Sequence, residues 1–184
     1  VNATERNSIK NKCTTPPAND ECSGAIDIPI NSTLEVITSV SATTVDATIN
    51  SSFPSNSCVG NQYQKDVWFS FTATAKRHII NFDDISFQNT NIYFTVHSGS
   101  CANLEIMQCG QANIPLMSVI SGLVVGVNYK IRVVVENNVP LTFNISLTTP
   151  AAVPNDNCNT AILIPVNPNM EYISSISGDI QGAS

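Results

Sequence analysis

Residues 66–73, with the sequence DVWFSFTA, alternate between apolar and mostly polar side chains. Val67, Phe69 and Phe71 fall on one side of an extended chain, because successive side chains of a β-strand point to opposite faces. A strand of this kind buries its apolar side against a core. The segment therefore predicts a β-strand with one buried face, and it decides the fold class for the rest of the chain.

The same alternation recurs in NYKIRVVV at 128–135 and in TFNISLT at 142–148. We expect these three strands to share one core, centred on Val67, Phe69, Phe71, Ile131, Val133, Phe143 and Ile145. Further strand candidates, separated by turns rich in Pro, Gly and Asn, are 24–30, 34–40, 77–82, 91–97, 104–108 and 116–120. About nine short strands at this spacing predict an all-β protein, an antiparallel β-sandwich.

The chain carries few charges for its size. Of its 184 residues, 12% are charged and 42% are apolar, and the formal net charge is −6. An acidic chain lacks the basic face that binding to nucleic acid requires. It also contains no apolar run approaching the roughly 20 residues that span a bilayer. We therefore expect no nucleic-acid partner and no membrane span in this segment.

The chain begins to repeat itself towards its C-terminal end. Residues 155–184 align without a gap on residues 19–48 at an offset of 136, with 13 of 30 positions identical. That offset fits a whole domain, because solenoid units are only about 20–50 residues long. We expect an N-terminal extension or linker at 1–15, a β-sandwich at 16–149, and a linker with the truncated first part of a second copy at 150–184. The partial copy indicates a segment of a longer tandem protein.

The second copy lacks most of its strands. An isolated pair of strands is marginal in water, and its unpaired edges invite another chain. We therefore expect residues 152–184 to be ordered only where they pack on the first copy or are completed by strands of another molecule.

Six cysteines in a chain of this size indicate an oxidising compartment. Cys101 and Cys109 bracket a short apolar run, and we expect them to pair across a hairpin. Cys22 and Cys58 lie in two turn-rich stretches, and we expect them to form a second bridge. Zinc is a weaker alternative, because the chain has no Cys-x2-Cys pair and its two histidines are isolated. Two cysteines have no assigned partner: Cys13 and Cys158.

Five segments in order resemble the bacterial pre-peptidase C-terminal domain, in the version strung in tandem through large secreted and surface proteins of the Bacteroidota. They are PPANDECSGAIDI, DVWFSFTAT, YFTVHSGSCANLEIMQCG, GLVVGVNYKIRVVV and TFNISLTTP. The resemblance spans roughly 16–149, and then 152–184 for the opening of the next copy. It implies a jelly-roll-like β-sandwich, export to the cell surface or beyond, often through the type IX secretion system, and a non-catalytic role.

No motif for a catalytic nucleophile is present. The nearest glycine pattern, Gly122 to Gly126, has neither G-x-S-x-G nor P-loop spacing. We interpret His78 and His97 as surface or turn histidines, which disfavours a Ser–His–Asp arrangement. We therefore expect the chain not to be an enzyme.

Two oxygen-rich clusters are candidate calcium sites. Asp83 and Asp84 follow a strand, and Asp20 and Glu21 precede a cysteine. Calcium takes six to eight oxygen ligands, often from separate loops, and members of the resembled family in other lineages bind it. The lack of regular ligand spacing favours the alternative, in which these side chains stabilise turns.

Trp68 is the only tryptophan, on the same strand face as Asp66 and Ser70. An exposed ring there would stack on a sugar or anchor a protein partner. We favour the alternative that a loop or the Cys22–Cys58 bridge covers the ring and completes a secondary core, because a lone Trp makes a poor sugar platform.

Two functions follow from these features. The leading hypothesis is a structural or adhesive spacer or fibre component of a large extracellular or cell-surface protein, with other copies of the repeat or neighbouring domains as its partners. The alternative is an accessory domain of a secreted protease or other hydrolase that binds a surface glycan or protein. Loss of micromolar binding in Trp68→Ala would favour the alternative.

Overall fold

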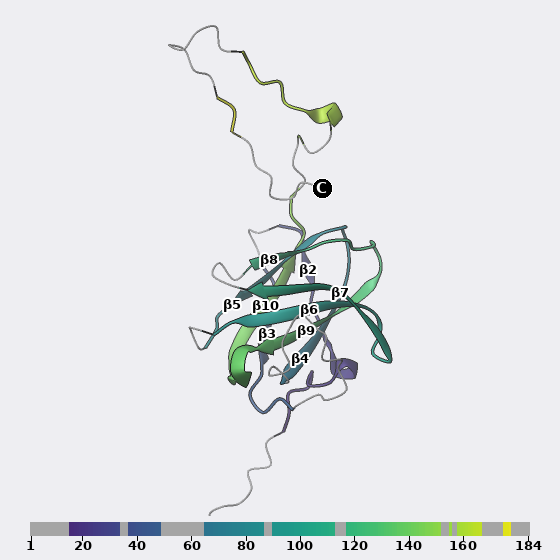
Figure 1. The fold of residues 1–184 in the computed structure, drawn as a ribbon, viewed down its shortest axis with the longest axis vertical. Coiled ribbons are helices and arrows are strands. Elements are labelled where there is room, and N and C mark those ends of the chain that lie inside the picture. Colours follow the sequence, from purple (N-terminus) through teal and green to yellow (C-terminus); the bar gives the residue numbers. More distant parts are fainter. Residues whose placement is uncertain are drawn as a thin grey trace, which may run out of the picture.

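The computed structural model describes residues 15–33, 37–48, 65–86, 90–112, 117–151, 155, 158–166 and 175–177. They form ten strands and three short 3-10 helices, with no α-helix among them, and the strands stack as a sandwich of two sheets (Figure 1). The 3-10 helices are η2 (Cys22–Gly24), η3 (Glu136–Asn138) and η4 (Cys158–Thr160). The expected all-β sandwich is confirmed.

Sheet A has the order β1-β4-β9-β6-β7. Its strands are β1 (Ile26–Asp27), β4 (Asp66–Thr72), β9 (Asn128–Val135), β6 (Ile92–Ser100) and β7 (Asn103–Ala112). Sheet B has the order β2-β10-β5-β8, and β3 also pairs with β10. Its strands are β2 (Ile30–Asn31), β3 (Val40–Thr43), β5 (His78–Asp83), β8 (Met117–Ile120) and β10 (Thr142–Thr148).

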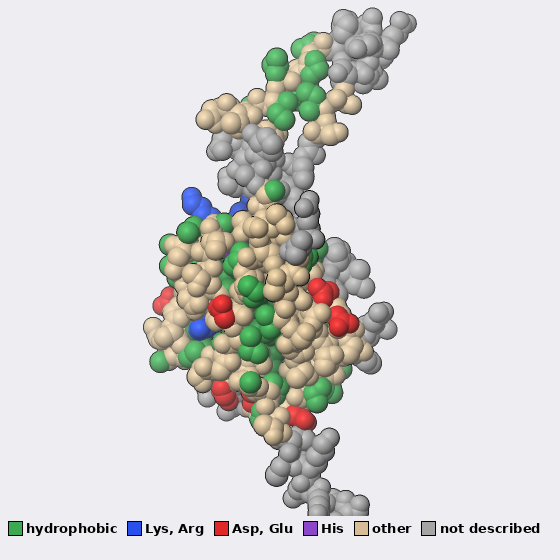
Figure 2. Space-filling model, turned by 180° about the vertical axis from the view of Figure 1, so that it is seen from behind, with side chains coloured by type: hydrophobic (Ala, Val, Ile, Leu, Met, Phe, Trp, Pro, Cys, Tyr) green, Lys and Arg blue, Asp and Glu red, His purple; other side chains and the backbone are tan. Residues whose placement is uncertain are grey.

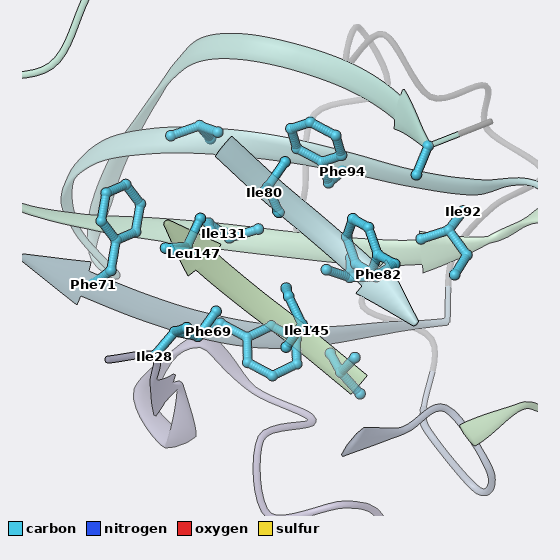
Figure 3. Close-up of a cluster of buried hydrophobic side chains, with 14 of the residues drawn as sticks. Ile28, Phe69, Phe71, Ile80, Phe82, Ile92, Phe94, Ile131, Ile145 and Leu147 are labelled. Atoms are coloured by element: carbon cyan, nitrogen blue, oxygen red, sulfur yellow. The ribbon is translucent and has the colours of Figure 1, made fainter. Parts of the chain in front are cut away.

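The main core fills the space between the two sheets (Figure 3). Alternate side chains of β4, β9 and β10 point into it, as the alternation in their sequences predicts. All seven expected core residues belong to this one cluster: Val67, Phe69, Phe71, Ile131, Val133, Phe143 and Ile145. The predicted strand faces are therefore confirmed.

The expected strand at 24–30 is divided between the two sheets. Ile26 and Asp27 pair in parallel with β4, whereas Ile30 and Asn31 pair in parallel with β10. Ile28 lies between them with its side chain in the core, and Pro29 follows, a residue with no N–H for a ladder. The two parallel pairings make both sheets mixed, whereas the other pairings are antiparallel.

The other strands deviate from expectation mainly at their ends. The expected strand at 34–40 is wrong where it can be compared, because 37–39 form no strand and β3 begins at Val40. Residues 34–36 lie outside the described residues. β7 is longer than the expected 104–108, because it pairs with β6 from Asn103 to Ala112 around an irregularity between Val96 and His97.

The described residues of 150–184 form η4 and no strand. Their apolar side chains are exposed: Ile162 by 47%, Leu163 by 89%, Ile164 by 74% and Val166 by 92% (Figure 2). Two expectations stay predictions. One is that 152–184 are ordered only where they pack on the first copy or are completed by another molecule. The other is the division of the chain into an extension, a domain and a partial copy. Within the part of the chain that the structure describes, no helix is both long and apolar enough to cross a membrane.

Candidate functional site

The outer face of sheet A, on the side away from the main core, carries two rows of side chains set by the strand register. One row crosses β4, β9, β6 and β7 as Trp68, Arg132, Thr95 and Cys109. The next row consists of Asp66, Val134, Tyr93 and Gln111. Besides Val134, four of these are almost fully buried: Asp66, Trp68, Arg132 and Thr95. We call these four residues and His97 the polar layer.

An ion pair lies at the centre of the polar layer. The Arg132 Nε donates to Asp66 Oδ2, and both side chains are buried. Burial raises the pKa of Asp66 to about 6, although the Arg132 charge opposes that rise. A buried carboxylate without its partner is costly, so removing either member of such a pair destabilises a fold strongly. The pair therefore fixes β4 against β9.

His97 completes the polar layer beside this pair. Its Nε2 lies 2.7 Å from Thr95 Oγ1, and its ring centroid is 5.6 Å from that of Trp68. Burial, together with the charge of Arg132, lowers the pKa of His97 to about 4. A neutral imidazole beside a hydroxyl resembles a nucleophile–base pair. Both groups are 1% exposed, however, so no substrate reaches them in this structure.

The N-terminal segment covers the polar layer. The Trp68 amide donates to the Asn19 carbonyl over 2.8 Å, and the Asn19 side chain donates to the Trp68 carbonyl over 3.0 Å. Trp68 is 0% exposed, so its ring is part of a secondary core and has no face free to stack on a sugar. The alternative of a buried tryptophan therefore describes the structure, but Cys22 is bonded to Cys101, so a Cys22–Cys58 bridge is not the cover.

The disulfide pairing expected from the sequence is wrong. Cys22 of η2 is bonded to Cys101 in the turn between β6 and β7, not to Cys58, and Cys101 is therefore not bonded to Cys109. Cys109 is also disulfide-bonded, and Cys13 and Cys58 lie outside the described residues. Cys158 is free and exposed. The sequence carries no signal for this pairing, because tertiary structure alone brings the turn that holds Cys101 next to η2.

The interpretation of the two histidines as surface residues is also wrong. His78 is 0% exposed and His97 is 1% exposed. His78 accepts a hydrogen bond from the Thr74 amide at Nε2, and its ring lies edge-on to Phe71. Burial lowers the pKa of His78. The sequence around His78 carries no signal for such burial, because the burial depends on contacts with the opposite sheet, such as the one with Phe71.

The calcium candidates take up other interactions. Both carboxylate oxygens of Asp20 accept hydrogen bonds from Thr48, one from its amide and one from its hydroxyl. Asp83 accepts from the Asn81 side chain, and Asp84 has a φ of 48°, a value common for Asp in turns. Within the described ranges, no group of three or more His, Cys, Asp or Glu residues is placed to hold a metal ion.

Among the described residues, the β6–β7 margin of the outer face of sheet A carries accessible side chains. Tyr93 is half-buried and pairs across the strands with Gln111, which is exposed. They continue the row that begins at Asp66, so the polar layer lies beside them on the same face. Sequence reasoning missed both residues, because only the cross-strand register brings them together.

Comparisons with known proteins identify one matching family. Residues 18–147 match the family described as galactose binding domain-like, whose modules are associated with type IX secretion. The crystal structure of PliG, a periplasmic inhibitor of g-type lysozyme from Aeromonas hydrophila, is similar at 13% identity. The similarity covers 67% of this chain and 96% of that one, with a TM-score of 0.36. No curated protein matches the chain.

The family corrects the narrower resemblance to the pre-peptidase C-terminal domain, while the expected link to type IX secretion is retained. The match spans well over half of the 184 residues. The chain therefore belongs to the galactose-binding-domain-like family of modules associated with type IX secretion.

Proposed function

We propose that this chain is a non-catalytic, glycan-binding module of a protein exported through the type IX system to the cell surface or beyond. The observation that carries the proposal is the family match over residues 18–147. Domains of this kind are typically binding modules without catalysis. The burial of Thr95 and His97 supports the same view, because the one hydroxyl–imidazole pair of the polar layer is closed to substrate.

We place the glycan contact at Tyr93 and Gln111. A tyrosine ring provides an apolar face for the C–H groups of a sugar and a hydroxyl for its edge. The Gln111 amide both donates and accepts hydrogen bonds, as sugar hydroxyls require. Binding sites work best when buried neighbours fix their side chains. Asp66 and Arg132, buried and paired in the adjoining part of the same face, supply that support.

A glycan array that includes galactose-terminated chains, followed by calorimetry on each hit, tests this assignment. Tyr93→Ala should abolish binding and Gln111→Ala should weaken it, whereas Tyr93→Phe, which keeps the ring, should retain most of it. Met117→Ala on β8 of the other sheet is the matched surface control and should bind as the parent does. Binding that survives Tyr93→Ala together with Gln111→Ala would place the contact elsewhere.

Trp68→Ala is not a valid test of sugar binding. The ring is 0% exposed and packs against His97, so its truncation leaves a cavity in the secondary core. A loss of binding in that variant would report loss of the fold.

A second candidate function is that of a spacer or fibre component, which the sequence repeat favours. Residues 155–184 repeat 19–48 at an offset of 136. We propose that the module is one of a tandem series, with neighbouring repeats as its partners in an adhesive surface protein. Small-angle scattering from a two-repeat piece of the parent protein should show a particle elongated by one module, whereas a compact particle would oppose the spacer role.

A further inference from the structure

Two turns form one end of the sandwich, which we call the basic end. The β4–β5 turn at 73–77 and the β8–β9 turn at 121–127 are joined by three backbone hydrogen bonds. They are Gly126 N–H to Ala73 O (2.8 Å), Ala73 N–H to Val127 O (3.0 Å) and Leu123 N–H to Lys76 O (3.1 Å). Neither turn contains an acidic residue. Lys76 is exposed, and Arg77 is half-buried beside it.

The basic end also presents an apolar tip. Val124 and Val125 are 60% and 59% exposed, whereas the neighbouring Leu123 is 4% exposed and anchors the turn in the core. The Val124 amide donates to the Tyr129 hydroxyl over 2.9 Å, which holds the tip to β9. The two valines are thus fixed outward next to positive charge.

The opposite end is acidic. Backbone hydrogen bonds join Thr44 to Leu141 and Ser86 to Thr142, so the turns after β3 and β5 lie together with the segment that follows η3. These turns and η3 carry Asp46, Asp84 and Glu136, of which Asp46 and Asp84 are exposed. The half-buried Lys65 lies beside η3, through a hydrogen bond from its amide to Asn138, and leaves the excess negative.

The acidic end has an apolar contact of its own. Val45, next to Asp46, is 42% exposed. Both ends therefore combine charge with an exposed valine, and the charges are opposite in sign. Figure 2 shows Lys and Arg side chains at the end where the C-terminal segment leaves the sandwich and one more at its middle, with Asp and Glu side chains around the middle and the other end.

The chain direction runs from the acidic end to the basic end. Asp20 bonds to Thr48, in the segment that follows the turn of Val45 and Asp46. Thr149, just after β10, lies against the β4–β5 turn, with its hydroxyl 3.3 Å from that of Thr74. In Figure 1 the C-terminal segment leaves the sandwich near β8, at the end opposite the lower tip of β4.

We propose that the basic end docks on the acidic end of a second copy of this module, so that copies associate head to tail. Lys76 and Arg77 would face Asp46, Asp84 and Glu136, with Val124 and Val125 packed against Val45. Such a contact uses two different surfaces and leaves one of each free, so it propagates as an open row. The proposal does not depend on glycan binding, since it uses the two ends and not the face of sheet A.

Self-association of the full 184-residue chain tests the proposal. Sedimentation and amide NMR chemical shifts, both measured at chain concentrations up to millimolar in low salt, should show dimers that grow into longer rows. Salt should reverse the growth, because charges at a surface are screened within about 10 Å at 0.1 M ionic strength. The shifts should be confined to the two ends. A chain that stays monomeric under these conditions overturns the proposal.

Complementing variants give the sharper test. Lys76→Glu with Arg77→Glu makes both ends acidic, and we expect it to weaken self-association by about tenfold or more. Asp46→Asn with Asp84→Asn neutralises the other end, and asparagine tolerates the positive φ values of 61° and 48° at these positions. Each variant alone should stay monomeric. A mixture of the two should form dimers, because each variant keeps one intact end and the two intact ends are complementary. The dimers should not grow, because both intact ends are then occupied.

The controls separate docking from folding. Lys130→Glu, on the outer face of sheet A, makes the same change of charge as each substitution at the basic end. It should leave association unchanged. Val124→Ser with Val125→Ser keeps every charge and should weaken association, and it replaces the basic-end variant if that one fails to fold. A mixture of folded complementing variants that stays monomeric, or an equal effect of Lys130→Glu, contradicts head-to-tail docking.

Discussion

Residues 22–30 and 158–166 are nearly the same peptide in two surroundings. They read CSGAIDIPI and CNTAILIPV, with five of nine positions identical. Both begin with a 3-10 helix of three residues, η2 and η4, closed by an alanine amide that donates to the cysteine carbonyl. The turn therefore forms in both places, which shows that it is specified locally.

Beyond the turn the two peptides differ. Ile28 is 1% exposed in the main core, whereas its counterpart Ile164 is 74% exposed. Cys22 is bonded to Cys101, whereas Cys158 is free. The strands β1 and β2 exist because β4 and β10 offer them partners, and 158–166 has no such partner among the described residues. Strand structure in this sequence is thus a property of the sheet that receives it.

The largest expected difference concerns the cysteines. Cys22→Ala with Cys101→Ala removes a bridge that joins residues 79 apart, and the chain-entropy relation gives a loss of about 4.5 kcal/mol in the free energy of unfolding. Cys158→Ala should change nothing measurable. Urea unfolding of both variants without reductant checks this. An equal effect of the two would mean that Cys158 also supports the fold.

The isoleucines should differ nearly as much. Ile28→Ala leaves a cavity between the sheets and should cost about 3 kcal/mol, within the usual range for buried isoleucine. Ile164→Ala should stay within about 0.5 kcal/mol, as exposed substitutions do. Thermal unfolding followed by circular dichroism measures both. A large loss in Ile164→Ala would show that 158–166 packs in solution as 22–30 does.

The third prediction uses pH to report whether the N-terminal segment stays docked over the polar layer. The pKa of His97 falls from 6.5 in the unfolded chain to about 4 in the folded one, so the unfolded state binds a proton first and stability is lost as pH falls from 6.5 to 4. The pKa of Asp66 rises from 3.8 to about 6, so Asp66 adds stability as pH falls from 6 to 3.8. Each contribution amounts to about 3 kcal/mol, and the two largely cancel.

His97→Asn removes one side of that balance. The difference in unfolding free energy between parent and variant should change by about 3 kcal/mol between pH 6.5 and pH 4, with the variant gaining as pH falls. Urea titrations at several pH values provide the measurement. A pH-independent difference would mean that His97 is hydrated and that the cover over the polar layer is open in solution.

The sequence could predict those parts of the fold that depend on one strand at a time. Alternation along β4, β9 and β10 was enough to place Phe69, Ile131 and Ile145 in one core, because period-two burial is visible within each segment. It could not reveal that the opposite face of β4 is buried as well. The Trp68 backbone is hydrogen-bonded to Asn19, which lies 49 residues earlier in the chain, so the segment beside this face is placed by tertiary structure.

The candidate site was less predictable than the fold for the same reason. His97 and Arg132 look like surface residues, because polar side chains on the outer face of a sheet are usually solvated. Tyr93 and Gln111 become neighbours only once β6 and β7 are in register. The disulfide pairing could not be predicted from loop length or flanking sequence, because the turn that holds Cys101 is brought to η2 by tertiary structure.

The smallest effect is expected at a single position at which the two peptides differ. Position 24 is glycine in η2, and its counterpart in η4 is Thr160. A Cβ at Gly24 would lie 2.3 Å from the carbonyl oxygen of Ala18, a backbone atom that cannot move without shifting the covering segment. Gly24→Thr should therefore destabilise by about 2 kcal/mol, as overpacking commonly does. Thr160→Gly, in exposed η4, should stay within about 0.5 kcal/mol.

Urea unfolding of the two reciprocal variants makes this comparison directly. Gly24→Ala should already show most of the loss, because the clash arises at Cβ and not further along the side chain. If Gly24→Thr were as stable as the parent, η2 would not be held against Ala18. The covering segment would then be free to leave Trp68, and the difference between the two copies would be one of degree.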